Sequence, residues 1–343
     1  MRSSLTPALS QRERESCLLS HCMSLARPKK DRIPPTESSA ARRVRLDTAG
    51  ARSLVSLIVR GGVDSVRAAR RAVPHLARAA WVVARAYSAG GRIFLVGAGT
   101  SGRLCAQEAA ECWPTFGVPR GRIDSIVAGG RPVLWRAVEG AEDDAMAGRS
   151  AIRMHRIDAN DCVIAVTASG KTPFVLAALR ESKRQGAATI LVTSNPRPAC
   201  SPAPDVLVVL RTGAETLTGS TRLKAGTAAK LALNAITTAG MSLAGRTFGS
   251  LMIDVRPTSA KLRERARRIV MELCGVNERT AASLLARSGY EPKTAVLMRR
   301  RKVSPAEARR ILRDCGGFLR AALAGHGIGH KKAQNAQNAE DVS

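Results

Sequence analysis

Two turns rich in glycine and hydroxyl side chains are the parts of this chain best suited to chemistry. They are Gly97–Arg103, with the sequence GAGTSGR, and Thr167–Pro173, with the sequence TASGKTP. Each follows an apolar run typical of a strand and leads into a segment typical of a helix, so unpaired backbone N–H groups are available at each turn. Such a position favours an anion, usually a phosphate. A single turn could be only a helix cap, but the pair predicts one shared anionic ligand.

The first turn also has the glycine spacing of a dinucleotide-binding turn. A dinucleotide site requires an acidic residue about 20 positions further on, which holds the ribose. The next predicted strand, over 123–127, ends instead in Ala128-Gly129-Gly130 and offers no carboxylate there. A small phosphorylated ligand therefore explains the turn better than a nucleotide does.

Carboxylates after the first turn are candidates for acid–base chemistry. Glu111 lies near the end of a predicted helix, where the negative end of the helix dipole favours a protonated acid. Such a carboxyl can act as a general acid, although Glu111 taken alone is more simply a surface residue. A second group packs four carboxylates into six positions, which suits either chemistry or a helix cap: Glu139, Glu142, Asp143 and Asp144. Their spacing matches no calcium loop, so no metal is expected.

A third polar loop, Gly213–Thr227, precedes a long predicted helix. Capping of that helix explains Ser220 or Thr221. Capping does not explain Glu215, Arg222 and Lys224 together. The loop is therefore a candidate to close over a sugar.

The composition narrows the class of ligand. The 343 residues are enough for a sizeable core, and the formal charge is +28. This charge suits nucleic acid or an anionic substrate, but aromatic residues make up only 3%, which leaves few platforms for stacked bases. No run approaches the roughly 20 apolar residues of a membrane span. The eight cysteines form no close metal-type pair and are expected to be reduced thiols of a cytoplasmic protein.

Strand and helix patterns alternate from Arg92 onwards, which predicts a doubly wound α/β fold with a parallel sheet and helices on both faces. Ligands of such sheets lie beyond the carboxyl ends of the strands. Strands are expected over 92–96, 123–127, 162–166, 188–192 and 206–210. Helices are expected over 104–112, where Pro114 ends the helix, and over 133–138, 174–185 and 223–243.

The rest of the chain is predicted to be helical or disordered. Two helices over 53–87 are interrupted at Gly61-Gly62 and Pro74, and four helical segments follow Thr258, over 260–274, 278–287, 292–299 and 305–323. The expected divisions are a disordered extension over 1–35, a sheet-containing domain with N-terminal helices over 36–258, a helical domain over 259–324 and a disordered tail over 325–343.

Five motifs in order resemble the N-acetylmuramic acid 6-phosphate etherase family, whose members have the sugar-isomerase (SIS) fold. The resemblance runs from about Thr36 to Leu323 and implies an SIS-type sheet with a small helical domain at its C-terminal side. It also implies a homodimer with sites near the subunit interface, and a role in peptidoglycan recycling. The motifs are Gly97–Arg103, Ala110–Cys112 with Pro114–Gly117, Glu139–Asp143, Ala168–Gly170 and Thr218–Thr227.

The resemblance implies a reaction and the residues that perform it. The D-lactyl ether of N-acetylmuramic acid 6-phosphate would be cleaved to N-acetylglucosamine 6-phosphate and D-lactate, by elimination from the open-chain aldehyde and then addition of water. Glu142 would remove the proton next to the aldehyde, and Glu111 would protonate the departing oxygen and then activate water. Neither step needs a metal or redox cofactor. The substrate would be held by Gly99, Thr100, Ser101, Ser169, Gly170, Lys171, Glu215, Ser220 and Lys224.

This sequence departs from the family pattern at three positions near these motifs. Glu108 stands where the family usually has Asp, Trp113 where it has Pro, and Lys171 where it has Arg, which keeps the charge but loses the planar fork. Before Arg92, little of the pattern remains beyond Thr36-Glu37 and Leu46-Asp47. These differences affect the expected substrate preference rather than the fold.

Two other functions are compatible with the same fold. One is a non-catalytic sensor of sugar phosphates, similar to the glucokinase regulatory protein. The other is a ketose–aldose isomerase, which would release no lactate. A sensor needs only the two phosphate-binding turns, so the presence of both Glu111 and Glu142 favours the etherase.

Overall fold

A computed structural model describes residues 34–38 and 46–325 of this chain, and the described residues from Pro35 to Gly325 belong to one compact unit. The disorder expected at the two ends falls on residues 1–33 and 326–343, which lie outside the described residues. Among the described residues, no helix is both long enough and apolar enough to cross a bilayer.

Five parallel strands form the sheet, in the order β2-β1-β3-β4-β5. The two inner strands β1 and β3 are buried along their whole length, which explains why their sequences are uninterrupted apolar runs. The predicted doubly wound α/β fold is confirmed. The strands are β1 Ile93–Gly97, β2 Ile123–Val127, β3 Cys162–Val166, β4 Ala188–Thr193 and β5 Val206–Val209.

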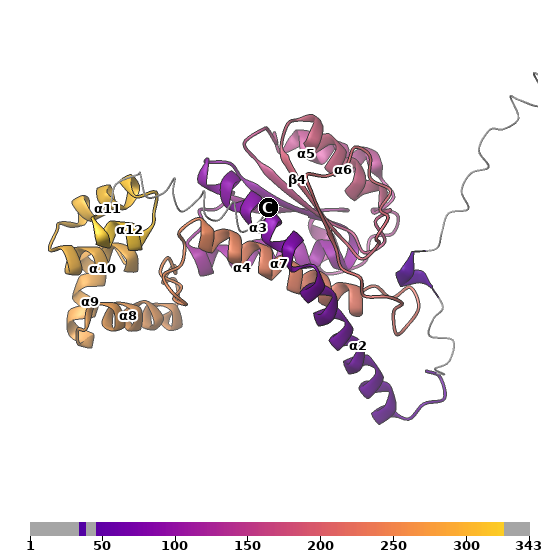
Figure 1. The fold of residues 1–343 in the computed structure, drawn as a ribbon, viewed down its shortest axis with the longest axis horizontal. Coiled ribbons are helices and arrows are strands. Elements are labelled where there is room, and N and C mark those ends of the chain that lie inside the picture. The colour runs from indigo at the N-terminus through magenta and orange to yellow at the C-terminus, as the bar shows by residue number, and fades with distance from the viewer. Residues whose placement is uncertain (1–33, 39–45, 326–343) are drawn as a thin grey trace, which may run out of the picture. The chain divides into compact units, whose positions relative to one another are not determined.

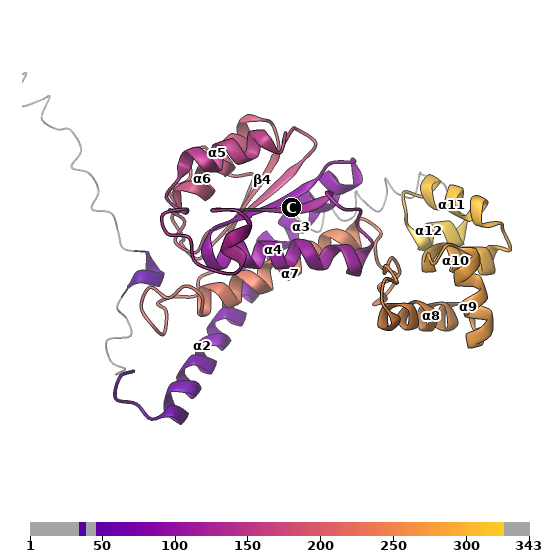
Figure 2. The ribbon, with the colours of Figure 1, turned by 180° about the vertical axis from the view of Figure 1, so that it is seen from behind.

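Helices cover both faces of the sheet (Figures 1 and 2). Side chains alternate along a strand, so Ile93 and Leu95 of β1 join one core while Phe94 and Val96 join the other. The first core is shared with α3 Val73–Ser88, α4 Gly99–Phe116 and α7 Lys224–Leu243; the second is shared with α5 Ala145–Met154 and α6 Pro173–Arg184.

Glycine and proline break the helices at fewer points than the sequence predicts. Helix α2, Ala51–Arg71, runs through Gly61-Gly62 without a break. A side chain at Gly61 would lie 3.1 Å from the Thr216 hydroxyl oxygen, so this glycine permits close packing rather than a break. Pro114 lies inside α4, which ends at Gly117 in a left-handed conformation (φ 62°). The prediction that Pro114 ends this helix is wrong, because a helix can lose one hydrogen bond in its last turn and continue.

The segment between β2 and β3 also differs from its prediction. A short 3₁₀ helix, η2 Arg131–Leu134, and turns stand where a helix over 133–138 is expected. The helix of this segment is instead α5, which begins after Asp144, whose carboxylate accepts a hydrogen bond from the Ala147 N–H at 2.8 Å. One of the four clustered carboxylates is therefore a helix cap.

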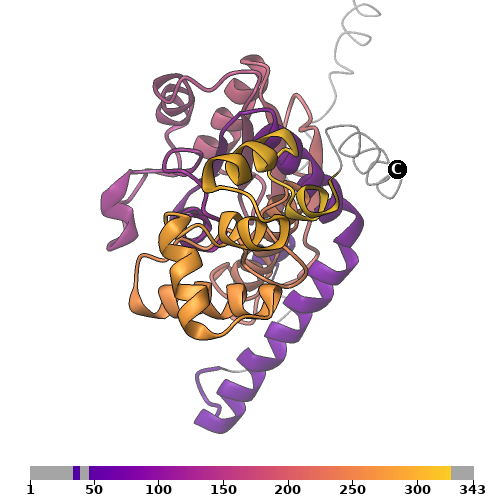
Figure 3. The same ribbon diagram turned by 90° about the vertical axis from the view of Figure 1, so that its left-hand side faces the viewer.

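The C-terminal helices lie close together (Figure 3). Their buried apolar side chains form a hydrophobic core of their own. The helix expected over 305–323 is two helices, because Gly316 and Gly317 both adopt positive φ angles, 62° and 86°. The helices are α8 Ala260–Cys274, α9 Glu278–Arg287, α10 Pro292–Arg301, α11 Pro305–Asp314 and α12 Leu319–Ala324.

Glu181 links the two helices of the second face and gives a pH-dependent contribution to stability. Its buried carboxylate accepts hydrogen bonds from Arg184 at 2.7 Å and from Arg153 of α5 at 2.8 Å. These bonds hold the pKa of Glu181 well below its usual range. The folded chain therefore keeps this group ionised at pH values where the unfolded chain is already protonated. The stabilisation is complete above the ordinary pKa and is lost as the pH falls below it.

We expect Glu181→Gln to lower the free energy of unfolding by about 1 kcal/mol at neutral pH, because its arginine partners are largely exposed. The loss should shrink near pH 3, because the carboxyl group of the unfolded wild-type chain is protonated there while that of the folded chain is still ionised. Urea unfolding of both proteins at the two pH values measures this difference. An equal loss at both pH values would contradict the assigned low pKa.

Candidate functional site

The turns after β1 and β3 line a single cavity of about 360 Å³. The two strands are hydrogen-bonded neighbours, and Gly97 pairs with Val166 at their carboxyl ends. The turns that follow these residues therefore begin side by side. Of the residues predicted to bind or transform a ligand, the cavity is lined by Gly99, Thr100, Ser101, Glu142, Ser169 and Lys171.

The first turn has the geometry of an anion site. The residue that caps α4, Ala98, has no side chain that could accept a hydrogen bond, so the first N–H groups of the helix stay open toward the cavity. Gly99 has a φ of 51°, which favours glycine. A side chain at Gly102 would lie 2.5 Å from a methyl group of Val127, so glycine also allows α4 to pack on β2. The open donors at a helix N-terminus favour a phosphate.

The second turn is held in place by its own hydroxyls and by a residue from β4. The hydroxyl oxygens of Thr167 and Thr172 are 2.7 Å apart, and the Lys171 N–H donates to the Ser169 hydroxyl oxygen at 3.2 Å. Asn195, which follows β4, donates its side-chain N–H to the Ser169 carbonyl at 2.7 Å. Ser169 and Lys171 therefore face the cavity from a rigid turn. Asn195 has no motif of its own, and sequence reasoning does not find it.

The position of Glu142 is fixed by a backbone hydrogen bond to the helix that leaves the second turn. The Phe174 N–H, in the first turn of α6, donates to the Glu142 carbonyl at 3.0 Å. Close packing of α5 on α6 reinforces this, since a side chain at Gly148 would lie 2.2 Å from the Phe174 carbonyl oxygen. Glu142 and Asp143 both line the cavity, whereas the neighbouring Asp144 caps α5.

Glu111 does not line this cavity. It is exposed on α4, 12 residues beyond Gly99, which corresponds to about 18 Å along the helix axis. The structure of one chain therefore brings Glu142 to the two turns but leaves Glu111 at the other end of α4.

Glu215 and Lys224 of the third loop have other partners. The Glu215 carboxylate accepts the N–H groups of Lys224 and Ala225, each at 2.9 Å, and so caps α7 in place of the expected Ser220 or Thr221. The Lys224 ammonium donates to Asp64 of α2 at 3.0 Å. Neither side chain lines the cavity. Of the described residues of this loop, only Gly219 and Thr221 line the cavity. Ser220, which is predicted to bind the substrate, lies between them in sequence but does not line it.

The three departures from the family pattern lie in different surroundings. Lys171 lines the cavity, but Trp113 lies at the far end of α4, with the Arg120 guanidinium 5.3 Å above its ring centre. Glu108 is buried and accepts hydrogen bonds from Asn234 at 2.6 Å and Thr237 at 2.5 Å, both on α7. Burial raises the pKa of Glu108, and these bonds oppose that rise. Glu108 therefore joins two helices and lies outside the cavity.

Cys112, next to Glu111, is a buried packing residue. Its thiol is buried, and burial raises its pKa to about 12, so the reactive thiolate is disfavoured. Six cysteines lie among the described residues, and none of them forms a disulfide with another described residue.

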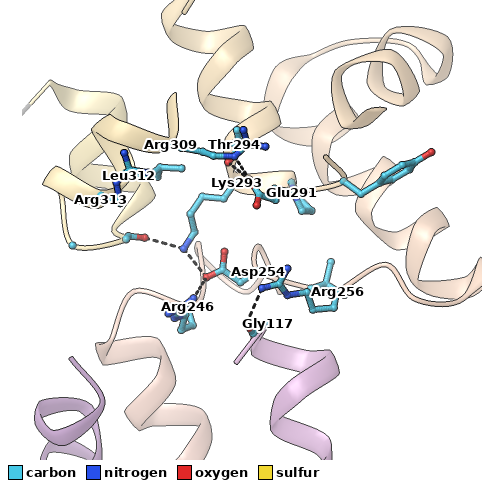
Figure 4. A pocket seen from close by; sticks show the side chains of 15 residues that line it. Gly117, Arg246, Asp254, Arg256, Glu291, Lys293, Thr294, Arg309, Leu312 and Arg313 are labelled. Carbon is cyan, nitrogen blue, oxygen red and sulfur yellow. Dashed lines mark hydrogen bonds and ion pairs between the residues drawn. The ribbon is translucent and has the colours of Figure 1, made fainter. Parts of the chain in front are cut away.

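A larger cavity, about 450 Å³, lies where the linker after α7 meets α10 and α11 (Figure 4). Its central side chain is the buried Lys293, whose ammonium donates to Asp254 at 2.7 Å and to the carbonyls of Gly317 and Gly245 at 2.8 and 3.0 Å. Burial lowers the pKa of Lys293, and the Asp254 carboxylate opposes that shift. With its three hydrogens accepted, Lys293 holds the polypeptide together here rather than offering a donor to a ligand.

Comparisons with known proteins identify the fold and the family of this chain. Residues 75–183 match the glucokinase regulatory protein N-terminal SIS domain, and residues 145–239 match the SIS domain. The N-acetylmuramic acid 6-phosphate etherase of Edwardsiella ictaluri is 41% identical over 278 residues, which cover 81% of this chain and 93% of that protein. The protein of the same name from Rubrobacter xylanophilus is 43% identical over 288 residues, 84% of this chain and 95% of that protein. Because similarity of this degree spans nearly all of each relative, the chain belongs to the N-acetylmuramic acid 6-phosphate etherase family.

Proposed function

We propose that this protein cleaves the D-lactyl ether of N-acetylmuramic acid 6-phosphate to N-acetylglucosamine 6-phosphate and D-lactate. The observation that carries this proposal is that Glu142 lines the same cavity as two anion-binding turns. Its relatives carry the name of that activity at 41–43% identity. On this proposal, the protein is a cytoplasmic enzyme that acts in amino-sugar recycling. Its reaction uses neither a metal nor a redox cofactor.

The two turns would bind the phosphate and orient the sugar. Open N–H groups at the start of α4 and the hydroxyls of Thr100, Ser101 and Ser169 are donors, and Lys171 supplies a positive charge beside them. Bound in this way, the open-chain sugar has its far end directed toward the loop that carries Glu142. Proximity of this kind makes the removal of a carbon-bound proton effectively intramolecular.

The chemistry is an elimination followed by an addition. Glu142 takes the proton from the carbon next to the aldehyde, and the electron pair forms a double bond as the ether bond to lactate breaks. The second carboxyl group, that of Glu111, acts as the acid and gives a proton to the departing oxygen. Glu111 then takes a proton from water, whose oxygen adds to the carbon that lost lactate, and the proton on Glu142 returns to its carbon. The cycle leaves both groups as they began.

Glu111 can take part only if a second copy of the chain supplies it, since about 18 Å of α4 separates it from the first turn of its own chain. A homodimer in which each α4 reaches the other copy's cavity would give two complete sites.

An exposed apolar stripe on α2 supports such a dimer. One face of this helix packs on the body through Gly61, Ser65 and Ala68. Its other face exposes valines spaced by three and four residues, and exposed stripes of this kind mark protein interfaces. They are Val55, Val59, Val63 and Val66, each about half exposed or more. The first half of α2, which carries two of them, extends away from the sheet (Figure 1).

We expect Val59→Asp combined with Val63→Asp to convert the dimer to a monomer and to abolish lactate release, because each site would lose its partner's Glu111. Sedimentation or light scattering measures the mass, and a D-lactate assay measures activity. Arg60→Asp, on the same helix outside the stripe, is the matched control and should change neither. A variant that remains dimeric would argue against this stripe as the interface, and a fully active monomer would argue against a shared site.

Incubation with N-acetylmuramic acid 6-phosphate, followed by an enzymatic assay for free D-lactate, tests the proposed function. The expected result is stoichiometric release of D-lactate and N-acetylglucosamine 6-phosphate. Binding of the sugar phosphate without release of lactate would overturn the enzyme and indicate a sensor. Isomerisation of a sugar phosphate without lactate release would indicate an isomerase.

A further inference from the structure

We propose that Glu37 is an additional substrate-binding residue, whose carboxylate accepts hydrogen bonds from the neutral, hydroxyl- and amide-bearing part of the amino sugar. This inference deepens the proposed function and rests on it for the identity of the sugar. Glu37 belongs to a short 3₁₀ helix, η1 Pro35–Glu37, and lies 60 positions before the start of the first turn in sequence. It nevertheless lines the same cavity as Ser101, Glu142 and Ser169.

Two contacts hold η1 against the third loop. The Gly219 N–H donates to the Thr36 carbonyl at 3.3 Å, and Thr36 itself is buried. The Glu37 carboxylate lies so close to Gly219 that a side chain there would stand 3.0 Å from one of its oxygens. Gly219 also has a φ of 78°, a conformation that favours glycine. The loop and η1 therefore close one side of the cavity together.

The charge of Glu37 is unusual for a pocket that binds phosphate. Among the described residues that line the cavity, Lys171 is the one cation, and three carboxylates accompany it: Glu37, Glu142 and Asp143. A carboxylate beside the phosphate would weaken binding, so Glu37 must face a part of the ligand that carries no negative charge. An ionised carboxylate can only accept hydrogen bonds, and sugar hydroxyls and an acetamido N–H are donors.

The carboxylate of Glu37 has no partner within the parts of the chain that the structure describes, 34–38 and 46–325. The chain therefore positions it at the cavity without using it to stabilise the fold. By contrast, the Glu215 carboxylate in the adjoining loop is fully used in capping α7. Glu215 is buried and used in the fold, whereas the exposed Glu37 carboxylate at the cavity is available to a ligand.

Isothermal titration of wild type and Glu37→Gln with N-acetylglucosamine 6-phosphate and with inorganic phosphate tests the inference. We expect Glu37→Gln to weaken binding of the sugar phosphate by about tenfold or more, because a hydrogen bond to a charged acceptor is lost. Affinity for inorganic phosphate should stay within about twofold, since the two turns remain intact. Glu139→Gln, which changes an exposed carboxylate outside the cavity, is the matched control and should alter neither affinity.

Two results would overturn the inference: unchanged affinity for the sugar phosphate, or an equal loss for both ligands, which would mean that Glu37 only supports the shape of the cavity. Turnover gives an independent measurement, in which Glu37→Gln should raise KM and leave kcat within about threefold. The titration does not depend on turnover. A wild-type protein that releases no lactate but binds the sugar phosphate through Glu37 would refute the etherase and support this inference.

Discussion

Replacing Glu142 by alanine is expected to abolish exchange of the proton next to the aldehyde, with a loss of about 10²–10⁴-fold, which is the usual contribution of a positioned base. Lactate release should fall by the same factor, because elimination cannot begin without removal of that proton. Exchange is measured by NMR in deuterated water with N-acetylglucosamine 6-phosphate, and release by the D-lactate assay. Binding of the sugar phosphate should persist, since both turns are unchanged.

Glu139→Ala is the control for this experiment. It removes a carboxylate from the same acidic cluster, but Glu139 is exposed and does not line the cavity. It should leave both rates within about twofold of wild type, since an exposed charge outside the site has little effect on the reacting groups. If exchange continues undiminished in Glu142→Ala, another group is the base.

Replacing Lys293 by methionine is expected to lower the free energy of unfolding by about 3–5 kcal/mol, the usual cost of removing one partner from a buried ion pair. The ammonium joins Asp254 of the linker to the Gly317 carbonyl at the start of the last helices (Figure 4). Methionine keeps much of the volume but leaves the Asp254 carboxylate and two carbonyls without this donor. Denaturant unfolding monitored by circular dichroism measures the loss.

Arg313→Met provides the matched control for Lys293. Arg313 lines the same cavity, but it is exposed, and no ion pair joins it to another described residue. Its replacement should change stability by no more than about 0.5 kcal/mol. If the two variants were equally stable, Lys293 would have no structural role at this junction.

The strands and the two turns could be predicted because their signals are local. A strand buried on both faces is an apolar run, and β1 and β3 match their predicted positions to within one residue. In the sheet, Gly97 of β1 pairs with Val166 of β3, so the two turns that follow these strands begin side by side. The cavity that both turns line follows from that adjacency.

The errors arise where tertiary packing overrides a local signal. Gly61 reads as a break, but it allows α2 to pack closely on the third loop. Pro114 reads as a stop, but α4 continues to Gly117. The charged residues Glu215 and Lys224 suggested a ligand, yet one caps α7 and the other pairs with Asp64. No pattern along the chain distinguishes a charge used in folding from one used in binding.

The sequence also fails to predict residues that line the cavity or support its turns. Glu37 and Asn195 come from segments far apart in sequence, and only the fold brings them to the turns. Glu142 could be proposed from its motif. The contact that fixes its position on α6 could not, because it is a backbone hydrogen bond and depends on no particular side chain. Glu111 could be proposed from its motif as well, but the length of α4 keeps it away from the cavity of its own chain, which is why the proposed mechanism takes it from a second subunit.

The central claim, that one subunit supplies the base and its partner the acid, is tested most directly by mixing two inactive variants. Glu111→Gln and Glu142→Gln, each carrying a different tag, are co-expressed so that dimers form at random, and D-lactate release is measured for the mixture. Half of the dimers are mixed, and each of these contains one site with both glutamates intact, so the predicted activity is about a quarter of wild type. Activity no higher than that of either variant alone would contradict the account, because two acids acting within one chain cannot complement each other.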